Sequence, residues 1–343
     1  MKPIDSALGL IGEDEATRAR IVEALKDYEQ LPAHRFTTVR DDVTGPVVDA
    51  LHASIGVVQK ELSTGLRFEF LYRSKIARDF VMSRPTVPDH VWEPQTTRVL
   101  LHLSRAARNV VVGGAYFGDH AIPIADALRG RGVCHAFEPD KAQAAMLERN
   151  AALNGLTNLR VDTRGLWSDG TSRLSFVGDD ALARTVPSDS GFATTTIDDY
   201  ADAAGICVDL IMLDLEGSEL DVLRGAERQL SSNAAHLVFE VHRSYVDWTG
   251  GLQDTEIVRY LASLGYTMFA IRDFQSNYDL SGRPVELVPV ETAWLEGPPH
   301  GFNILAVRDP DLVSGDGFRL APGVSPKLLL HRDPALHHPA GGL

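Results

Sequence analysis

The chain has 343 residues, of which 44% are hydrophobic and 23% are charged. This composition is typical of a globular protein with at least one ordinary hydrophobic core, and it excludes a collagen-like or disordered chain. Lysine and arginine number 33 against 47 aspartates and glutamates, a formal net charge of −14. Because such a surface repels a polyanion, nucleic acid is not an expected partner.

Cysteine content and hydropathy bear on where the protein works. Cys134 and Cys207 lie in apolar stretches and are too few for a disulfide framework. The residues after Met1 lack the apolar core of a secretory signal, and the longest apolar runs fall far short of the ~20 residues that span a bilayer. We therefore expect a cytoplasmic protein without a transmembrane segment.

Two amphipathic helices are predicted near the beginning of the chain. The first covers 13–30 and the second about 46–62, each with apolar residues at helical spacing on one face. Three prolines between 83 and 95 break this periodicity, so residues 1–88 are predicted to form a helical appendage and linker. The apolar faces of the two helices could pair across a symmetric homodimer.

From about residue 97, short β-branched runs alternate with helical segments. This alternation is typical of βαβ units and a parallel sheet, so residues 89–309 are predicted to form one α/β domain. Residues 310–343 are rich in Gly, Pro and His and lack periodicity, which predicts a loose tail. Strands are predicted at 109–113, 133–137, 208–213, 236–241, 266–271 and 302–307, with short edge strands at 173–177 and 194–197, and helices at 120–128, 141–153, 219–230 and 255–264.

A glycine-rich turn joins the strand predicted at 109–113 to the helix predicted at 120–128. It has the sequence Gly113-Gly114-Ala115-Tyr116-Phe117-Gly118-Asp119. Glycines let the backbone approach a ligand closely, and a helix N-terminus offers N–H donors to an anionic group. The spacing fits neither the G-x-G-x-x-G pattern of dinucleotide enzymes nor the phosphate loop of nucleotide triphosphatases, which argues against NAD and ATP.

A carboxylate follows the strand predicted at 133–137, about twenty residues after the glycine turn. In doubly wound folds, a carboxylate at the position of Glu138 can accept hydrogen bonds from the two hydroxyls of a ribose. The alternative is that it only interacts with the N-terminus of the next helix.

Acidic residues also end two later strands. Asp214 and Glu216 follow the strand predicted at 208–213, and Glu240 and His242 end the strand predicted at 236–241. Ligands of open α/β sheets bind outside the carboxyl ends of the strands, so these residues and the glycine turn predict one shared site.

The order of these motifs resembles the FkbM family of S-adenosylmethionine-dependent methyltransferases. The upstream run Trp92-Glu93-Pro94 is similar to the family's aromatic-Glu-Pro entry into the domain. The resemblance covers roughly residues 90 to 307. The family patterns G-A-x-x-G, F-E-P, T-[LI]-D-D and D-x-E-G-x-E-x-x-V-L-x-G-A match residues 114–118, 137–139, 196–199 and 214–226.

The resemblance implies a fold and a cofactor. The fold is that of class I methyltransferases, a Rossmann-like sheet of seven mostly parallel strands whose last strand is antiparallel, with the helical appendage before it. The cofactor is S-adenosylmethionine, with Glu138 at the ribose hydroxyls and Glu93 at the amino-acid end. Gly114 and Gly118 are expected along the methionine and ribose portion. The other expected cofactor-binding residues are Gly113, Ala115, Tyr116, Asp119, Pro139 and Asp214.

One residue departs from the family pattern. The family usually carries an acid two residues before the position of Gly114, and Val112 occupies that place. The methionine ammonium then needs another acceptor, for which Glu93 and Asp119 are the candidates.

The implied reaction is O-methylation of a hydroxyl on a sugar, a glycan or a secondary metabolite. The cofactor is already an activated electrophile, so in-line positioning and a general base are the expected contributions of the protein. His242 is predicted as the base because imidazoles titrate near neutral pH, with Asp214 and Glu240 as alternatives. No metal is expected, although Asp214, Glu216 and His242 could assemble a magnesium site.

Two other classes of protein stay open. One is a catalytically inactive methyltransferase-like module that binds a partner through its N-terminal helices, and Val112 is the residue that favours it. The other is a nicotinamide oxidoreductase on a similar sheet, against which the glycine spacing argues.

Overall fold

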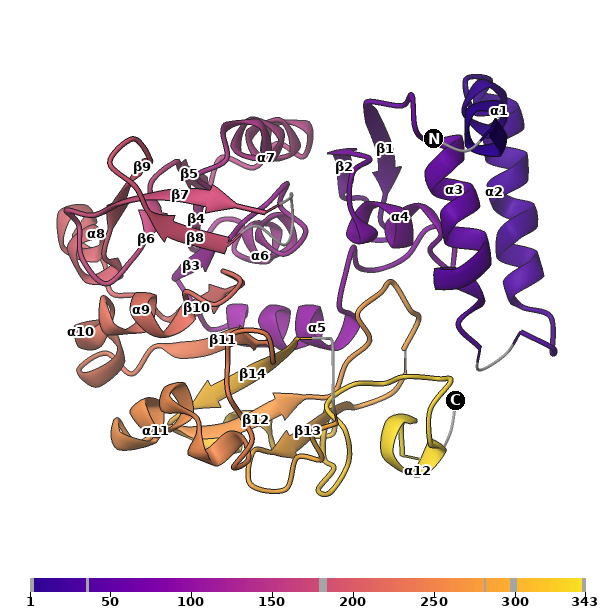
Figure 1. The fold of residues 1–343 in the computed structure, drawn as a ribbon. Coiled ribbons are helices and arrows are strands. Elements are labelled where there is room, and N and C mark those ends of the chain that lie inside the picture. Colours follow the sequence, from indigo (N-terminus) through magenta and orange to yellow (C-terminus); the bar gives the residue numbers. More distant parts are fainter. Residues whose placement is uncertain (1–2, 35–36, 179–183, 281, 297–300, 341–343) are drawn as a thin grey trace.

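A large, mostly parallel sheet forms the centre of the computed structural model, which describes residues 3–34, 37–178, 184–280, 282–296 and 301–340 (Figure 1). The sheet has nine strands in the order β15-β13-β12-β14-β11-β10-β3-β4-β5. The strands are β3 (Asn109–Gly113), β4 (Val133–Phe137), β5 (Leu159–Asp162), β10 (Leu210–Leu213), β11 (His236–Val241), β12 (Thr267–Ile271), β13 (Val285–Pro289), β14 (Phe302–Val307) and β15 (Phe318–Leu320).

The strand directions confirm the predicted fold class. The five strands from β5 to β11 run parallel to their neighbours, and β14 lies antiparallel between β11 and β12. This is the Rossmann-like sheet with an antiparallel last strand that the sequence predicts. The strands β13 and β15 extend it from the seven expected strands to nine.

Helices cover both faces of the sheet because alternate residues of each strand point to opposite sides. Val110 and Val112 pack with α5 (Pro94–Ser104), α6 (Ala121–Ala127) and α7 (Lys141–Leu153). Val111, between them, belongs to the core on the other face. The helices on that face are α8 (Ile197–Ala204), α9 (Glu219–Arg224), α10 (Glu227–Ser231) and α11 (Glu256–Ser263).

A small second sheet lies between β5 and α8 in the sequence. It contains the edge strand predicted at 173–177 and a strand that begins two residues before the one predicted at 194. Its strands are β6 (Gly165–Leu166), β7 (Arg173–Val177), β8 (Arg184–Pro187) and β9 (Phe192–Thr195), in the order β6-β9-β7-β8.

The N-terminal segment is partly helical, as predicted, but it also contains a β-hairpin. The second predicted helix, at 46–62, ends at Leu51, because Gly56 interrupts it and Val57 begins a strand of alternating burial. The elements are α1 (Pro3–Gly12), α2 (Glu15–Glu29), η1 (Arg40–Thr44), α3 (Gly45–Leu51), β1 (Val57–Glu61), β2 (Arg67–Leu71) and α4 (Lys75–Val81).

The β1–β2 hairpin is attached to the main domain beside α7 (Figure 1). The backbone N–H of Glu69 donates to Oδ1 of Asn150 (2.7 Å), and the Asn150 amide donates to the carbonyls of Glu69 and Phe117 (both 2.8 Å). The Phe117 ring stacks on Phe70, with 5.6 Å between the ring centroids. Since Phe117 belongs to the glycine-rich turn, the hairpin supports that turn directly.

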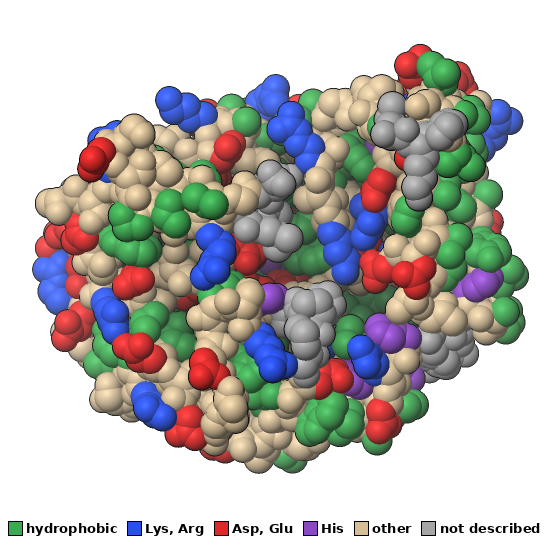
Figure 2. Space-filling model, in the orientation of Figure 1, with side chains coloured by type: hydrophobic (Ala, Val, Ile, Leu, Met, Phe, Trp, Pro, Cys, Tyr) green, Lys and Arg blue, Asp and Glu red, His purple; other side chains and the backbone are tan. Residues whose placement is uncertain are grey.

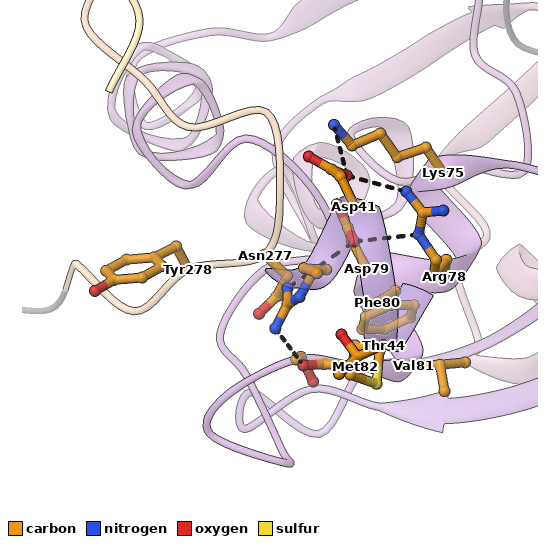
Figure 3. A network of polar contacts seen from close by, with 12 residues as sticks. Asp41, Thr44, Lys75, Arg78, Asp79, Phe80, Val81, Met82, Asn277 and Tyr278 are labelled. Atoms are coloured by element: carbon orange, nitrogen blue, oxygen red, sulfur yellow. Dashed lines mark hydrogen bonds and ion pairs between the residues drawn. The ribbon is translucent and has the colours of Figure 1, made fainter. Parts of the chain in front are cut away.

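A buried acid joins the elements of the N-terminal segment. The Asp79 carboxylate on α4 lies 3.8 Å from Nε of Arg78 and 3.9 Å from Nη1 of Arg40 (Figure 3). Arg40 also binds Glu29 at 2.7 Å and donates to the Met82 carbonyl at 3.1 Å. Burial raises the pKa of Asp79 to about 6, so the two guanidinium groups offset only part of its desolvation.

The segment after residue 309 is ordered, which corrects the prediction of a loose tail. Besides β15 it contains η4 (Pro310–Val313) and α12 (Pro334–His337), and residues 341–343 lie outside the described ranges. Arg272, buried beside β12, donates to the carbonyls of Ser325 (3.1 Å) and Leu336 (3.0 Å). The segment therefore supplies hydrogen-bond acceptors to a buried cation, a role that its aperiodic sequence does not predict. The division of the chain at residue 89 stays a prediction.

The helices of the described ranges include none with the length and apolar character needed to cross a bilayer.

An ordered C-terminal segment predicts different costs for two leucine substitutions. Leu328 is buried with Phe274 and Leu280, so Leu328→Ala should lower the free energy of unfolding by about 2–4 kcal/mol. Leu320 is 61% exposed, and Leu320→Ala should change it by less than about 0.5 kcal/mol. Urea denaturation of both variants measures the difference. Equally small effects on the free energy of unfolding would show that the segment is a loose tail after all.

Candidate functional site

A pocket of about 250 Å³ lies at the carboxyl ends of β3, β4 and β10. The face of the molecule in Figure 2 is hollowed near its centre, and acidic side chains are visible inside the hollow. Of the ten residues predicted to bind the cofactor, Glu93 and Gly118 are not part of the pocket lining. The eight that line it are Gly113, Gly114, Ala115, Tyr116, Asp119, Glu138, Pro139 and Asp214.

The two glycines expected along the ligand have different structural roles. Gly114 has a φ of 75°, and a Cβ there would lie 1.9 Å from the Asp214 carbonyl oxygen. Only glycine therefore lets the turn after β3 pass this close to the end of β10. Gly118 has a φ of 101°, and a Cβ there would lie 2.6 Å from both Ile122 and Leu147, so this glycine permits α6 and α7 to pack.

Glu138 is held in a fixed orientation at the end of β4. Its two carboxylate oxygens accept hydrogen bonds from the backbone N–H groups of Tyr116 (2.8 Å) and Asp140 (2.9 Å). Burial raises the pKa of Glu138 to about 7, although these two bonds lower it. Each carboxylate oxygen has a second lone pair, so the group can accept further hydrogen bonds from two neighbouring hydroxyls.

Another polar group lies where the turn enters α6. Asp119 and His120 both line the pocket. His120 Nε2 lies 3.6 Å from Oε2 of Glu93 and 3.9 Å from Oδ2 of Asp119. Glu93 begins α5 and accepts a 2.7 Å hydrogen bond from the Asn303 amide. His120 was not predicted from the sequence, because a single histidine at the start of a helix does not indicate a binding site.

Three carboxylates meet at the ends of β10 and β11. Oxygens of Asp214, Glu216 and Glu240 lie within 4.8 Å of one another, a spacing that one divalent cation could bridge. Glu240 thus occupies the place in this cluster that the sequence assigned to His242. Burial first and the charge of Glu240 second raise the pKa of Glu216 to about 8 and raise the pKa of Asp214 well above its ordinary value. Burial also raises the pKa of Glu240 to about 7, although the hydrogen bond from Tyr245 lowers it.

His242, the first choice for a general base, is not one of the pocket-lining residues. Its Nδ1 accepts a 3.0 Å hydrogen bond from the backbone N–H of Ser244 and lies 2.5 Å from the Ser244 hydroxyl. The Tyr245 hydroxyl instead reaches the cluster and donates to Glu240 at 2.5 Å. The geometry therefore favours Asp214, which lines the pocket, over His242 as a group that could accept a proton there. Glu240 does not line the pocket but lies beside Asp214 in the cluster.

The comparisons with known proteins agree with this site. The sequence model of the Methyltransferase FkbM domain matches residues 113–268, which include the glycine turn, Glu138 and all three clustered carboxylates. This part of the chain is similar to an FkbM methyltransferase domain. Among curated proteins, no match to the chain was found.

Solved structures similar to the chain are methyltransferases, at low identity. The FkbM methyltransferase from Methylobacillus flagellatus KT shares 17% identity with a TM-score of 0.37 and 58% of this chain covered, and the chain spans 43% of that protein. An rRNA methylase from Streptococcus thermophilus shares 10% (TM-score 0.35; 61% and 93% covered). An O-methyltransferase from Bacillus cereus in complex with SAH shares 13% (TM-score 0.35; 62% and 79% covered).

Parts of the pocket wall could not be predicted from the sequence motifs. The small sheet and α4 line the pocket with apolar side chains. The sequence of residues 165–204 is too polar and interrupted to predict a single element, so it gave no sign of this wall. These lining residues are Ile76, Leu174, Phe176 and Phe192.

The raised carboxyl pKa values at this site predict lower stability at higher pH. A carboxyl whose pKa is higher in the folded than in the unfolded state keeps its proton longer when folded, so stability is lost as pH rises through the folded value. Here the window runs from the ordinary value of 4.5 to about 7 for Glu240 and to about 8 for Glu216 and Glu219. The melting temperature should therefore fall between roughly pH 4.5 and pH 8.

Glu240→Gln should reduce this fall by a few degrees, because the amide does not ionise and can still accept from Tyr245. Thermal melts across the pH range measure the slope, with Glu148→Gln on the exposed face of α7 as the matched control. Equal slopes for both variants and the wild type would contradict the assignment.

Proposed function

We propose that the protein is an S-adenosylmethionine-dependent O-methyltransferase that acts on a hydroxyl of a sugar, a glycan or a secondary metabolite. The observation that carries the proposal is one pocket, in the part of the chain similar to an FkbM domain, that is lined both by the fixed carboxylate of Glu138 and by the high-pKa carboxyl of Asp214. The first suits a ribose and the second suits an acceptor hydroxyl.

The residues present fit the cofactor. Backbone bonds from Tyr116 and Asp140 fix both oxygens of Glu138, which leaves their remaining lone pairs available to the two ribose hydroxyls. Gly113, Gly114 and Ala115 bring the backbone to the pocket wall without side chains that would fill it. When bound, the cofactor supplies a methyl group already activated by a positively charged sulfur.

The chain's own contribution is positioning and proton transfer. Methyl transfer needs the acceptor oxygen in line with sulfur and carbon, which the walls of the pocket enforce by orientation. The hydroxyl must also lose its proton, and a carboxylate whose pKa is raised toward neutrality is a better acceptor than an ordinary one. We assign this role to Asp214 with Glu240 beside it. The earlier candidate, His242, is kept as the alternative.

The acceptor is proposed to be a small molecule or a glycan. The carboxylates of Asp214 and Glu216 accept hydrogen bonds from hydroxyl groups, and the small sheet adds apolar walls to the same pocket. A net charge of −14 disfavours nucleic acid as the acceptor.

A catalytically inactive binding module is the second candidate. Val112 lines the pocket and offers it no charge. A protein of this kind would keep the fold and lose the cofactor, so direct binding measurements separate the two functions.

Replacing Glu138 by glutamine should weaken binding of S-adenosylhomocysteine at least tenfold. The amide loses the charge that the ribose hydroxyls bind, and its NH₂ group faces a backbone donor. Isothermal titration calorimetry measures the affinity, with Glu148→Gln as a control and NAD as a control ligand. Failure of the wild type to bind any adenosyl ligand would leave the binding module as the function.

The affinity of the wild type should depend on pH. With a pKa of Glu138 near 7, the ionised form falls about tenfold between roughly pH 8 and pH 6, and affinity should fall with it. Glu138→Gln should show a flatter profile. A profile that is unchanged by the substitution would assign the pH dependence to another group.

The acid cluster predicts that S-adenosylmethionine releases more protons on binding than S-adenosylhomocysteine. The extra positive charge of the methylated ligand favours the ionised forms of Asp214 and Glu240. Calorimetry near neutral pH in two buffers of different ionisation enthalpy counts the protons. Asp214→Asn should reduce the difference between the ligands, and an equal release for both would contradict the assignment of Asp214 as the proton acceptor.

A further inference from the structure

The end of the pocket next to α6 carries its own pair of opposite charges. Val112, Asp119 and His120 line this part of the pocket, and Val112 is apolar. Asp119 is 8% exposed and His120 is 5% exposed, so both groups are largely withdrawn from water. Charged side chains are seldom buried to this extent unless they are paired or bind a ligand.

One nitrogen of the His120 imidazole lacks a hydrogen bond. Its Nδ1 lies 3.4 Å from the Thr97 hydroxyl, whereas its buried Nε2 has no hydrogen-bond partner in the described part of the chain. Burial lowers the pKa of His120, but the negative charges of Asp119 and Glu93 outweigh this effect and raise it overall. The carboxylates of Glu93 and Asp119 lie 3.6 and 3.9 Å from Nε2, beyond hydrogen-bond distance, so an anionic group in the pocket could supply the hydrogen bond that the buried N–H lacks.

Glu93 keeps this imidazole in place without lining the pocket. Its Oε2 is 3.6 Å from Nε2 of His120 and accepts the 2.7 Å hydrogen bond from Asn303. Glu93 therefore acts through His120, as a positioning residue, and does not reach the ligand itself.

We propose that Asp119 and His120 bind the amino-acid end of the cofactor, with the His120 imidazolium taking the α-carboxylate and Asp119 taking the α-ammonium. This inference rests on the proposed function. A zwitterion presents one charge of each sign on a single carbon, which matches two opposite charges on adjacent residues. Asp119 lies three residues after Tyr116, whose N–H fixes Glu138, so one turn places both ends of the ligand.

Three adenosyl ligands separate the charges by chemistry. S-Adenosylhomocysteine has both groups, decarboxylated S-adenosylmethionine keeps the amine alone, and 5′-deoxy-5′-methylthioadenosine has neither. His120→Asn should weaken S-adenosylhomocysteine at least tenfold and leave the other two within twofold. Asp119→Asn should weaken the first two ligands and spare methylthioadenosine. Calorimetry on the full chain gives each affinity.

The controls keep the outcomes distinct. His52→Asn replaces a buried histidine of the N-terminal segment that does not line the pocket, and it should leave all three affinities unchanged. If His120→Asn weakens the binding of all three ligands equally, His120 has only a structural role and the proposal is overturned. The proposal is also overturned if His120→Asn leaves all three affinities unchanged. If wild-type protein binds none of the ligands, the proposed function itself fails.

Discussion

The burial of carboxylates at one edge of the central sheet is the constraint on which the rest of the structure depends. Glu93, Asp119, Glu138, Glu240 and Asp273 lie at this edge, and none is more than 8% exposed. Removing so many acids from water is costly unless each is hydrogen-bonded or paired. Backbone N–H groups donate to Glu138 and Asp273, whereas the side chains of Asn303 and Tyr245 donate to Glu93 and Glu240.

The C-terminal segment contributes to the same balance. Lys327 is buried beside the segment that follows β12, because its backbone pairs with that of Asp273. Its amine has no hydrogen bond in the described ranges. Burial lowers its pKa to about 7, while Glu240 and Glu93 raise it. The segment that composition alone assigned to a loose tail thus places a cation among the acids of the edge. The role of Lys327 therefore follows from its position in the fold, and the local sequence pattern does not predict it.

The sequence predicts the central sheet well for a physical reason. Buried parallel strands need runs of β-branched and apolar residues, and those at 109–113 and 236–241 are strands with the predicted bounds. Val58 shows the opposite case. It continues a helical spacing from the preceding segment, yet it belongs to β1 and its backbone pairs with β2, a partner that the spacing cannot reveal.

The site was predictable where a backbone position imposes the residue type. Glu138 ends a strand at the sheet edge, and Gly114 passes too close to Asp214 for any side chain, so both stand out in the sequence. Gly118 belongs to the same motif but serves helix packing, because a motif does not distinguish contact with a ligand from contact with a neighbouring helix. His120 and Tyr245 are single residues whose importance comes only from what the fold places beside them.

The contacts of Phe117 make the N-terminal hairpin and the glycine turn one cooperative unit. The Phe117 ring lies against Phe68 and Phe70. The Phe117 backbone carbonyl accepts a hydrogen bond from the Asn150 amide, which also donates to the carbonyl of Glu69. Local opening of the hairpin would strip these contacts from the turn and leave it without lateral support. A partner that binds the hairpin would therefore change the stability of the turn and the affinity of the pocket for its ligand. By linkage, a ligand in the pocket would change the affinity of the hairpin for that partner by the same coupling free energy.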